Sequence, residues 1–169
     1  MDAASGIHRA DVALSRAART HGHGHAVEKA VAAFSKLGEH AALWLALGAA
    51  GATLDRPRRA RWLRALRAVV AAYVANVVVK QVARRARPDF DDLPQLVRTP
   101  TQLSFPSSHA TSSFAGARAY APLLGGVAGA ALYPLAAALA ASRVYLGVHY
   151  PTDILAGAAL GTFVGDRAR

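Results

Sequence analysis

The chain has 169 residues, of which 53% are hydrophobic, and its formal net charge is +10 at pH 7. This length suffices for one compact domain. The absence of cysteine excludes disulfides, zinc–thiolate sites and thiol nucleophiles. The positive charge indicates an acidic partner: nucleic acid, anionic lipid or a phosphorylated substrate.

Residues 1–37 are predicted to form an N-terminal amphipathic segment that lies on a membrane surface. Helical spacing over residues 11–19 and 26–37 gives an apolar face, but the segment is too polar to span a bilayer. The stretch His21-Gly22-His23-Gly24-His25 interrupts it. Alternating glycines give these histidines no fixed geometry, which favours a flexible polar linker over a metal site.

Residues 38–169 contain five apolar runs, near 39–54, 63–82, 107–124, 127–142 and 151–164. A helix needs roughly 20 residues to cross the hydrocarbon core of a bilayer. Proline and glycine mark the breaks between runs, and Trp62 is expected at a membrane interface. The predicted fold class is an all-α integral membrane bundle of about five transmembrane helices plus the N-terminal amphipathic helix. A soluble all-α bundle is the alternative.

The order of these runs brings three polar clusters to one membrane face. The second run ends at Lys80, and an aperiodic loop over residues 89–106 stays on that face. The third run leaves this face at His109, and the fourth returns to it at Arg143. The loop that carries His149 therefore lies on the same face.

Basic residues dominate the first cluster. Lys80, Arg84 and Arg87 have the spacing of one helical face, and Arg143 would join them from another helix. Such a pocket suits a phosphate, although a basic segment that meets lipid headgroups is an equal alternative. Ser107 and Ser108 are expected to open a helix, where free N–H groups bind phosphate or where serine acts only as a cap.

Two histidines can divide the chemistry of phosphate transfer. Asp153 follows His149 by four residues, so the carboxylate can fix the imidazole tautomer while the other ring nitrogen attacks phosphorus. Protonated His109 would then donate to the leaving oxygen. No carboxylate cluster suits Mg²⁺, so a metal-independent, cofactor-free reaction is predicted. Asp89, Asp91 and Asp92 are the alternative metal cluster, with a solvated loop preferred.

The pattern closely resembles the three-part signature of the type 2 phosphatidic acid phosphatase (PAP2) superfamily. The matching stretches are Lys80 to Arg87-Pro88, Pro106-Ser107-Ser108-His109, and Ser142-Arg143 to His149 to Asp153. The one departure is Ser108, where the family usually has glycine. The resemblance implies phosphate contacts from Lys80, Arg87, Ser107, Ser108 and Arg143. It also implies acid–base work by His109, nucleophilic attack by His149 and activation of His149 by Asp153.

The resemblance implies a membrane lipid phosphatase whose PAP2-like domain covers residues 38–169 and which works through a phosphohistidine. Gly38-Glu39-His40 and residues 44–48 resemble one branch of the family. That branch implies decaprenylphosphoryl-5-phosphoribose as substrate and decaprenylphosphoryl-ribose as product, in cell-wall arabinan precursor synthesis. Alternatives are a polyprenyl diphosphate or phosphatidylglycerophosphate phosphatase, and a non-enzymatic basic protein that binds anionic lipid.

The expected partners are the lipid phosphate and the membrane, without nucleic acid, and the sequence leaves the oligomeric state open. The basic turn at residues 56–61 and the arginines of the tail fall on the face opposite the site. The N-terminal segment and residues 80–98 put comparable positive charge on the site face, but phosphate binding would explain some of those cations. Because cytoplasmic loops carry an excess of Lys and Arg, the expected location is the plasma membrane with the active site on its outer face.

Overall fold

The computed structural model describes residues 3–168 and is helical through most of that range. The predicted all-α fold is confirmed. The helices are α1 (Ala3–Thr20), α2 (His25–Lys36), α3 (Ala42–Leu54), α4 (Arg59–Ala83), α5 (Ser108–Leu124), α6 (Gly126–Tyr145) and α7 (Pro151–Asp166), with the short 3-10 helices η1 (Glu39–Ala41) and η2 (Arg56–Arg58).

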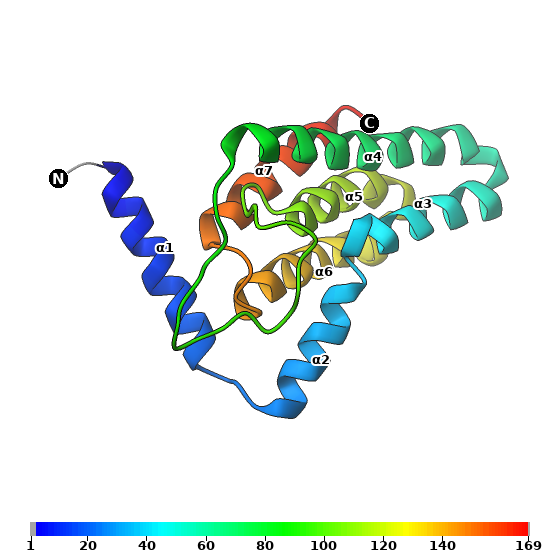
Figure 1. Cartoon of the computed structure of the whole chain (residues 1–169). Helices are drawn as coiled ribbons and strands as arrows, with labels where there is room; N and C mark the ends of the chain where they lie inside the picture. Colours follow the sequence, from blue (N-terminus) through cyan, green and yellow to red (C-terminus); the bar gives the residue numbers. More distant parts are fainter. Residues whose placement is uncertain (1–2, 169) are drawn as a thin grey trace.

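Helix α5 forms the centre of the bundle and packs against α4, α6 and α7 (Figure 1). Small residues allow this close approach. A Cβ added to Gly161 of α7 would lie 2.2 Å from the Thr111 carbonyl oxygen, and one at Gly157 would lie 2.6 Å from that of Ser107. Helix α5 presents mainly alanine, serine and glycine, so backbones can touch.

A cluster of large side chains fills the bundle around α3, α4 and α5. Trp44 and Tyr120 are fully buried, and Trp62 is only 3% exposed. The Trp62 indole donates to Asp55 Oδ2 at 2.9 Å, and its ring stacks on Tyr120. Trp62 therefore faces the protein interior rather than lipid headgroups, and its position at a membrane interface stays a prediction. The hairpin of α3 and α4 turns this ring inward against Gly51, where a Cβ would meet it at 2.2 Å.

Apolar side chains also cover outward faces of the bundle. Val70, Val74 and Val78 follow one face of α4 and are 47–59% exposed, and Leu155 and Phe163 are exposed on α7. The helical segments Arg56–Ala83 and Gly126–Tyr145 are long and apolar enough to cross a membrane. Helices α3, α5 and α7 have 13, 17 and 16 residues, or about 20, 26 and 24 Å. Five spans therefore stay a prediction.

Helices α1 and α2 form an arm beside the bundle, and the loop between α4 and α5 passes close to it (Figure 1). Helix α1 turns polar residues inward, because Asp11, Ser15 and Arg19 are buried while Ile7 and Leu14 are each 57% exposed. An outward apolar stripe suits a helix on a membrane surface. The domain boundary between residues 37 and 38 stays a prediction.

Candidate active site

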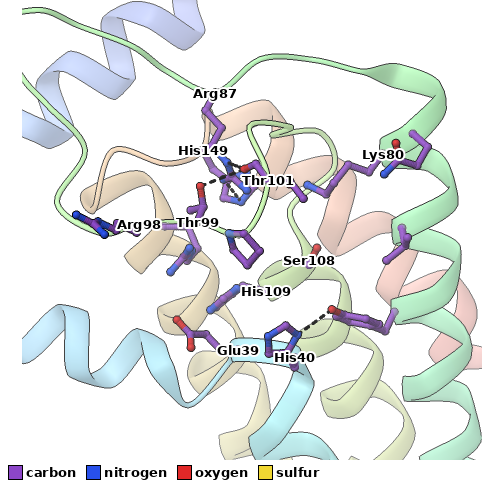
Figure 2. Close-up of a pocket in the computed structure, with 15 residues that line it drawn as sticks. Glu39, His40, Lys80, Arg87, Arg98, Thr99, Thr101, Ser108, His109 and His149 are labelled. Carbon is purple, nitrogen blue, oxygen red and sulfur yellow. Dashed lines mark hydrogen bonds between the residues drawn. The ribbon is translucent and has the colours of Figure 1, made fainter.

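The ends of α4 and α6 and the starts of α5 and α7 meet at one end of the bundle. There they surround a pocket of about 360 Å³. The loop between α4 and α5 closes its side (Figure 2). The pocket brings together six residues of the predicted site: Lys80, Arg87, Ser108, His109, Arg143 and His149.

His149 lies in the turn between α6 and α7 and is 3% exposed. Its Nδ1 lies 3.3 Å from Asp153 Oδ2, and its Nε2 lies 3.1 Å from Arg87 Nη1. Because a carboxylate can only accept, Nδ1 carries the proton, and the Nε2 lone pair accepts from Arg87 Nη1. Burial lowers the pKa of His149 to about 3. The imidazole is therefore neutral at pH 7 and can act as a nucleophile.

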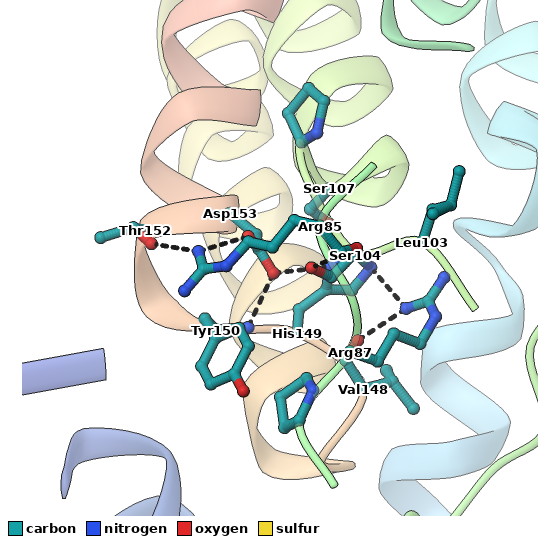
Figure 3. A network of polar contacts seen from close by, with 12 residues as sticks. Arg85, Arg87, Leu103, Ser104, Ser107, Val148, His149, Tyr150, Thr152 and Asp153 are labelled. Atoms are coloured by element: carbon teal, nitrogen blue, oxygen red, sulfur yellow. Dashed lines mark hydrogen bonds and ion pairs between the residues drawn. The ribbon is translucent and has the colours of Figure 1, made fainter. Parts of the chain in front are cut away.

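Asp153 is fully buried at the start of α7, and both of its oxygens are occupied (Figure 3). Oδ2 also accepts from the backbone N–H of Tyr150 at 2.9 Å, while Oδ1 accepts from Arg85 Nη1 at 2.9 Å. Arg85 in turn donates to Thr152 and to Asp11 of α1. Sequence reasoning missed Arg85 and Asp11. Arg85 could not be distinguished by sequence from the neighbouring Arg84 and Arg87, and Asp11 lies more than 130 residues from Asp153.

Three cations converge on the pocket. Lys80 Nζ donates to the carbonyl oxygens of Leu103 and Ser104, both at 3.1 Å. Arg87 donates through Nε to the Thr101 carbonyl at 2.8 Å and through Nη1 to the Val148 carbonyl at 2.6 Å. These carbonyls fix the two side chains without neutralising them.

Arg143 is the third cation and is 5% exposed. Its Nη1 donates to Ser35 Oγ of α2 at 2.7 Å, and its Nε has no hydrogen-bond partner within the described residues. Buried polar groups are nearly always satisfied, so a free guanidinium N–H at a pocket wall is suited to an anion. The N-terminal segment thus reaches the site, and nothing in the sequence around Ser35 indicated this contact.

Arg84 does not join these cations. Helix α4 ends at Ala83, and Arg84 has a left-handed backbone with φ of 48°. Its side chain is exposed and does not line the pocket. The prediction that Lys80, Arg84 and Arg87 share one helical face is therefore wrong. It assumed that the helix continued to Pro88, whereas Arg87 reaches the pocket from a loop.

His109 lies in the first turn of α5 and is 7% exposed. Its Nε2 lies 3.0 Å from the Ser35 carbonyl oxygen. Since a carbonyl can only accept, this nitrogen carries a proton. The ring faces the same pocket as His149, which gives the site two histidines with different partners (Figure 2).

Ser107 caps α5, as its sequence position predicted. Its Oγ accepts from Ala110 N at 3.5 Å, while its own N–H donates to the Asp153 carbonyl at 3.0 Å. The side chain is fully buried and does not line the pocket. Ser108 does line the pocket, and its hydroxyl donates to Asn76 Oδ1 at 2.6 Å. A phosphate contact from Ser107 stays a prediction.

The alternative metal clusters do not assemble. Within residues 3–168, no three or more His, Cys, Asp or Glu side chains are grouped so as to hold a metal ion. Asp92 pairs with Arg16 instead. His23 stacks on Tyr145 with ring centroids 4.0 Å apart and bonds to the Ala18 carbonyl through Nε2. It therefore packs as a structural residue rather than forming part of a flexible linker.

The family model of the PAP2 superfamily matches residues 61–166, which include Lys80, His109 and His149. The chain belongs to the PAP2 superfamily. The decaprenylphosphoryl-5-phosphoribose phosphatase of Mycolicibacterium smegmatis is 47% identical over 125 residues, covering 74% of this chain and 68% of that protein. The protein of the same name from Mycobacterium tuberculosis is 44% identical over 132 residues, covering 78% and 72%.

Solved PAP2 structures share the fold. A transmembrane phosphatidylglycerolphosphate phosphatase from Bacillus subtilis superposes with a TM-score of 0.76 at 27% identity, covering 96% of this chain and 84% of that one. Aquifex aeolicus LpxE gives 0.78 at 23% identity, with 92% of each chain covered, and shows the fold alone. These likenesses and the named relatives make this PAP2 protein a membrane phosphatase, a phosphoric monoester hydrolase.

Proposed function

We propose that the chain removes the 5-phosphate of decaprenylphosphoryl-5-phosphoribose and so supplies decaprenylphosphoryl-ribose for cell-wall arabinan precursors. The substrate is supported by relatives of that name at 44–47% identity over about three quarters of the chain. The pocket accords with it, since three buried cations can hold one phosphoryl group. The partners are this lipid phosphate and the plasma membrane, with the active site on the outer face.

In the proposed mechanism, His149 Nε2 attacks phosphorus while the bond to the ribose oxygen breaks. His109, protonated on both ring nitrogens once the phosphate dianion is bound, gives its Nδ1 proton to that leaving oxygen and becomes neutral. Asp153 accepts the Nδ1 hydrogen bond and supports the charge that develops on the His149 ring. Water, deprotonated by His109, then attacks the phosphohistidine, which releases phosphate and restores His149.

Lys80, Arg87 and Arg143 would hold the equatorial phosphoryl oxygens as charge shifts in the transition state. No metal ion is needed in this scheme, because the three cations supply the positive charge. A divalent ion would also meet repulsion from them. If activity were lost with a chelator and returned with Mg²⁺, metal independence would be rejected.

The main support for this proposal is the position of the His149 ring. One ring nitrogen faces a buried carboxylate and the other lies among the cations of the pocket. Replacing His149 with alanine should lower phosphate release roughly a thousandfold or more, as loss of a nucleophile does in other enzymes. His21→Ala is the matched control, since His21 is exposed just after α1 and, within residues 3–168, its side chain bonds only to Ala17 and Thr20 of that helix.

Purified protein in detergent, incubated with substrate labelled in the 5-phosphate and rapidly quenched in alkali, should carry label on His149. The label should be absent from His149→Ala. Full turnover by that variant would refute the mechanism. The substrate is tested by measuring, in parallel, the rates of hydrolysis of phosphatidylglycerophosphate and of a polyprenyl diphosphate. If either is hydrolysed faster than the phosphoribosyl lipid, the proposed substrate is wrong.

A further inference from the structure

The pocket continues past the phosphate-binding residues to a second polar group, formed by Glu39, His40 and Tyr73. The PAP2 signature gives these residues no role. Glu39 and His40 lie beside His109 (Figure 2), and a Cβ on the preceding Gly38 would meet the His109 ring at 2.6 Å. Because the proposed acid must touch the leaving oxygen, this group borders the leaving-group side of the scissile phosphate.

The backbone that carries the group is strained. His40 and the following Ala41 both have left-handed conformations, with φ of 49° and 60°. Residues with a Cβ rarely adopt this region, and such strain persists mainly at functional sites. Here it forms η1 and places Glu39 and His40 at the pocket, with His40 Nδ1 lying 3.1 Å from the Tyr73 hydroxyl.

The charge of Glu39 is unexpected in a phosphate pocket. This carboxylate is exposed, makes no hydrogen bond or ion pair within residues 3–168, and interacts electrostatically with Arg143. A carboxylate repels a second phosphate but accepts hydrogen bonds from hydroxyl groups. We propose that Glu39, supported by the His40–Tyr73 pair, binds hydroxyl groups of a sugar attached to the scissile phosphate. This subsite rests on the proposed function.

The test compares two substrates in detergent micelles: the phosphoribosyl polyprenyl lipid and phosphatidic acid, which has no sugar. Glu39→Gln keeps the shape of the side chain but weakens its acceptor. We expect kcat/KM for the sugar substrate to fall about tenfold or more, with phosphatidic acid unchanged or faster. Thr99→Val is the control, because Thr99 lines the other rim and its hydroxyl bonds to the Thr101 carbonyl.

Equal loss on both substrates, or no loss on either, would overturn the subsite while leaving the phosphatase assignment intact. A wild-type protein that does not hydrolyse the phosphoribosyl lipid would instead reject the proposed function. If phosphatidic acid is bound but not hydrolysed, its inhibition constant replaces its rate in the same comparison.

The network behind Asp153 carries a second, independent inference. Arg85 Nη1 bonds to Asp153 Oδ1 at 2.9 Å (Figure 3). Arg85 Nη2 bonds to Asp11 Oδ2 at 2.8 Å. Asp11 is 1% exposed and also accepts from the backbone N–H of Thr152 at 3.0 Å and from its hydroxyl. Burial opposes its ionisation, but the bonds from Thr152 and Arg85 prevail and lower the pKa of Asp11.

We infer that Asp11 and Arg85 are positioning residues for the proposed reaction. The Asp153 carboxylate would turn about its Cβ–Cγ bond if only Tyr150 N–H and His149 held it. Arg85 fixes the second oxygen, and Asp11 fixes Arg85 from a helix that lies before the matched family segment. The Asp11 charge also balances Arg85, so the fields of the two groups largely cancel at the His149 ring.

Asp11→Asn should lower kcat about tenfold or more with KM within twofold, because the amide has only one acceptor oxygen. If that oxygen accepts from the Thr152 N–H, the NH2 group faces Arg85 and releases it. Asp11→Glu should recover part of the loss. Arg16→Ala is the matched control: it breaks the Arg16–Asp92 pair, which also ties α1 to the loop but does not touch Asp153. An equal loss of kcat in Arg16→Ala, or an unchanged kcat in Asp11→Asn, would contradict the positioning role. Asp11 would then serve only to attach α1 to the bundle.

Discussion

Ser108 stands where the PAP2 signature usually has glycine, and its hydroxyl is held by the buried Asn76. The backbone N–H of residue 108 remains available at the start of α5. We expect Ser108→Gly to keep kcat/KM within about threefold, since this N–H rather than the side chain would meet phosphate. The free energy of unfolding should fall by about 1–3 kcal/mol, because Asn76 Oδ1 loses its donor.

Phosphate release and thermal unfolding in detergent check both parts. Ser108→Ala is the control, because it removes the same hydrogen bond without the added backbone freedom of glycine. A drop in activity of more than tenfold in a variant that still folds would show that the hydroxyl itself serves the reaction.

The contact between His149 and Asp153, the two residues proposed for the chemistry, was predictable because their side chains and their spacing are both distinctive. Their supporting residues were not. Ser35 bonds to Arg143 from α2, and Asn76 bonds to Ser108 from α4, yet neither residue belongs to a recognisable motif. Arg84 was misplaced because a three-residue spacing pattern does not say where a helix ends. Contacts between residues far apart in the sequence can be identified only once the fold is known.

At the scale of elements, the packing of α7 on α5 determines where Asp153 lies. The Asp153 carbonyl accepts from Ser107 N at 3.0 Å, so the starts of both helices are joined at the site. Farther along, Gly157, Gly161 and Gly165 let the two backbones touch. The apolar runs predicted both helices, but their order in space depends on these small residues, which a hydrophobicity pattern does not distinguish.

Gly161→Ala should therefore destabilise the protein by about 1–3 kcal/mol, because its Cβ would lie 2.2 Å from the Thr111 carbonyl oxygen. The Thr111 carbonyl belongs to the backbone and cannot change rotamer as a side chain can. Helix α7 must therefore shift, and Asp153 moves with it. We expect a lower unfolding temperature in detergent and a lower kcat. Ala159→Leu, on an exposed face of the same helix, should change neither. Wild-type stability in Gly161→Ala would contradict this packing.

At the scale of the whole molecule, exposed arginines are concentrated at the η2 end of the bundle, although Arg84 and Arg98 are also exposed at the pocket end. The pocket opens at the end where α4 finishes and α7 begins. The other end carries the η2 turn and its basic neighbours, which are exposed and stay clear of that pocket: Arg56, Arg58, Arg59, Arg61 and Arg64. Lys80, Arg87 and Arg143 line the pocket, and the proposed phosphate binding would account for them without any lipid contact.

This asymmetry predicts the orientation in the membrane. Exposed Lys and Arg near the ends of membrane helices favour the cytoplasmic side, which puts the η2 end inside and the pocket outside. The chain has no cysteine, so a single introduced thiol reports one position without background. Asp91→Cys marks the exposed loop at the pocket end, and Ala60→Cys marks the start of α4 at the other.

A membrane-impermeant maleimide added to intact cells should label Asp91→Cys and leave Ala60→Cys unlabelled until the membrane is permeabilised. Both variants should keep phosphatase activity, because neither residue lines the pocket. The reverse labelling pattern would place the site inside. The lipid would then lose its phosphate in the cytoplasmic leaflet. The positive charge around η2 would not reflect a cytoplasmic location of that end.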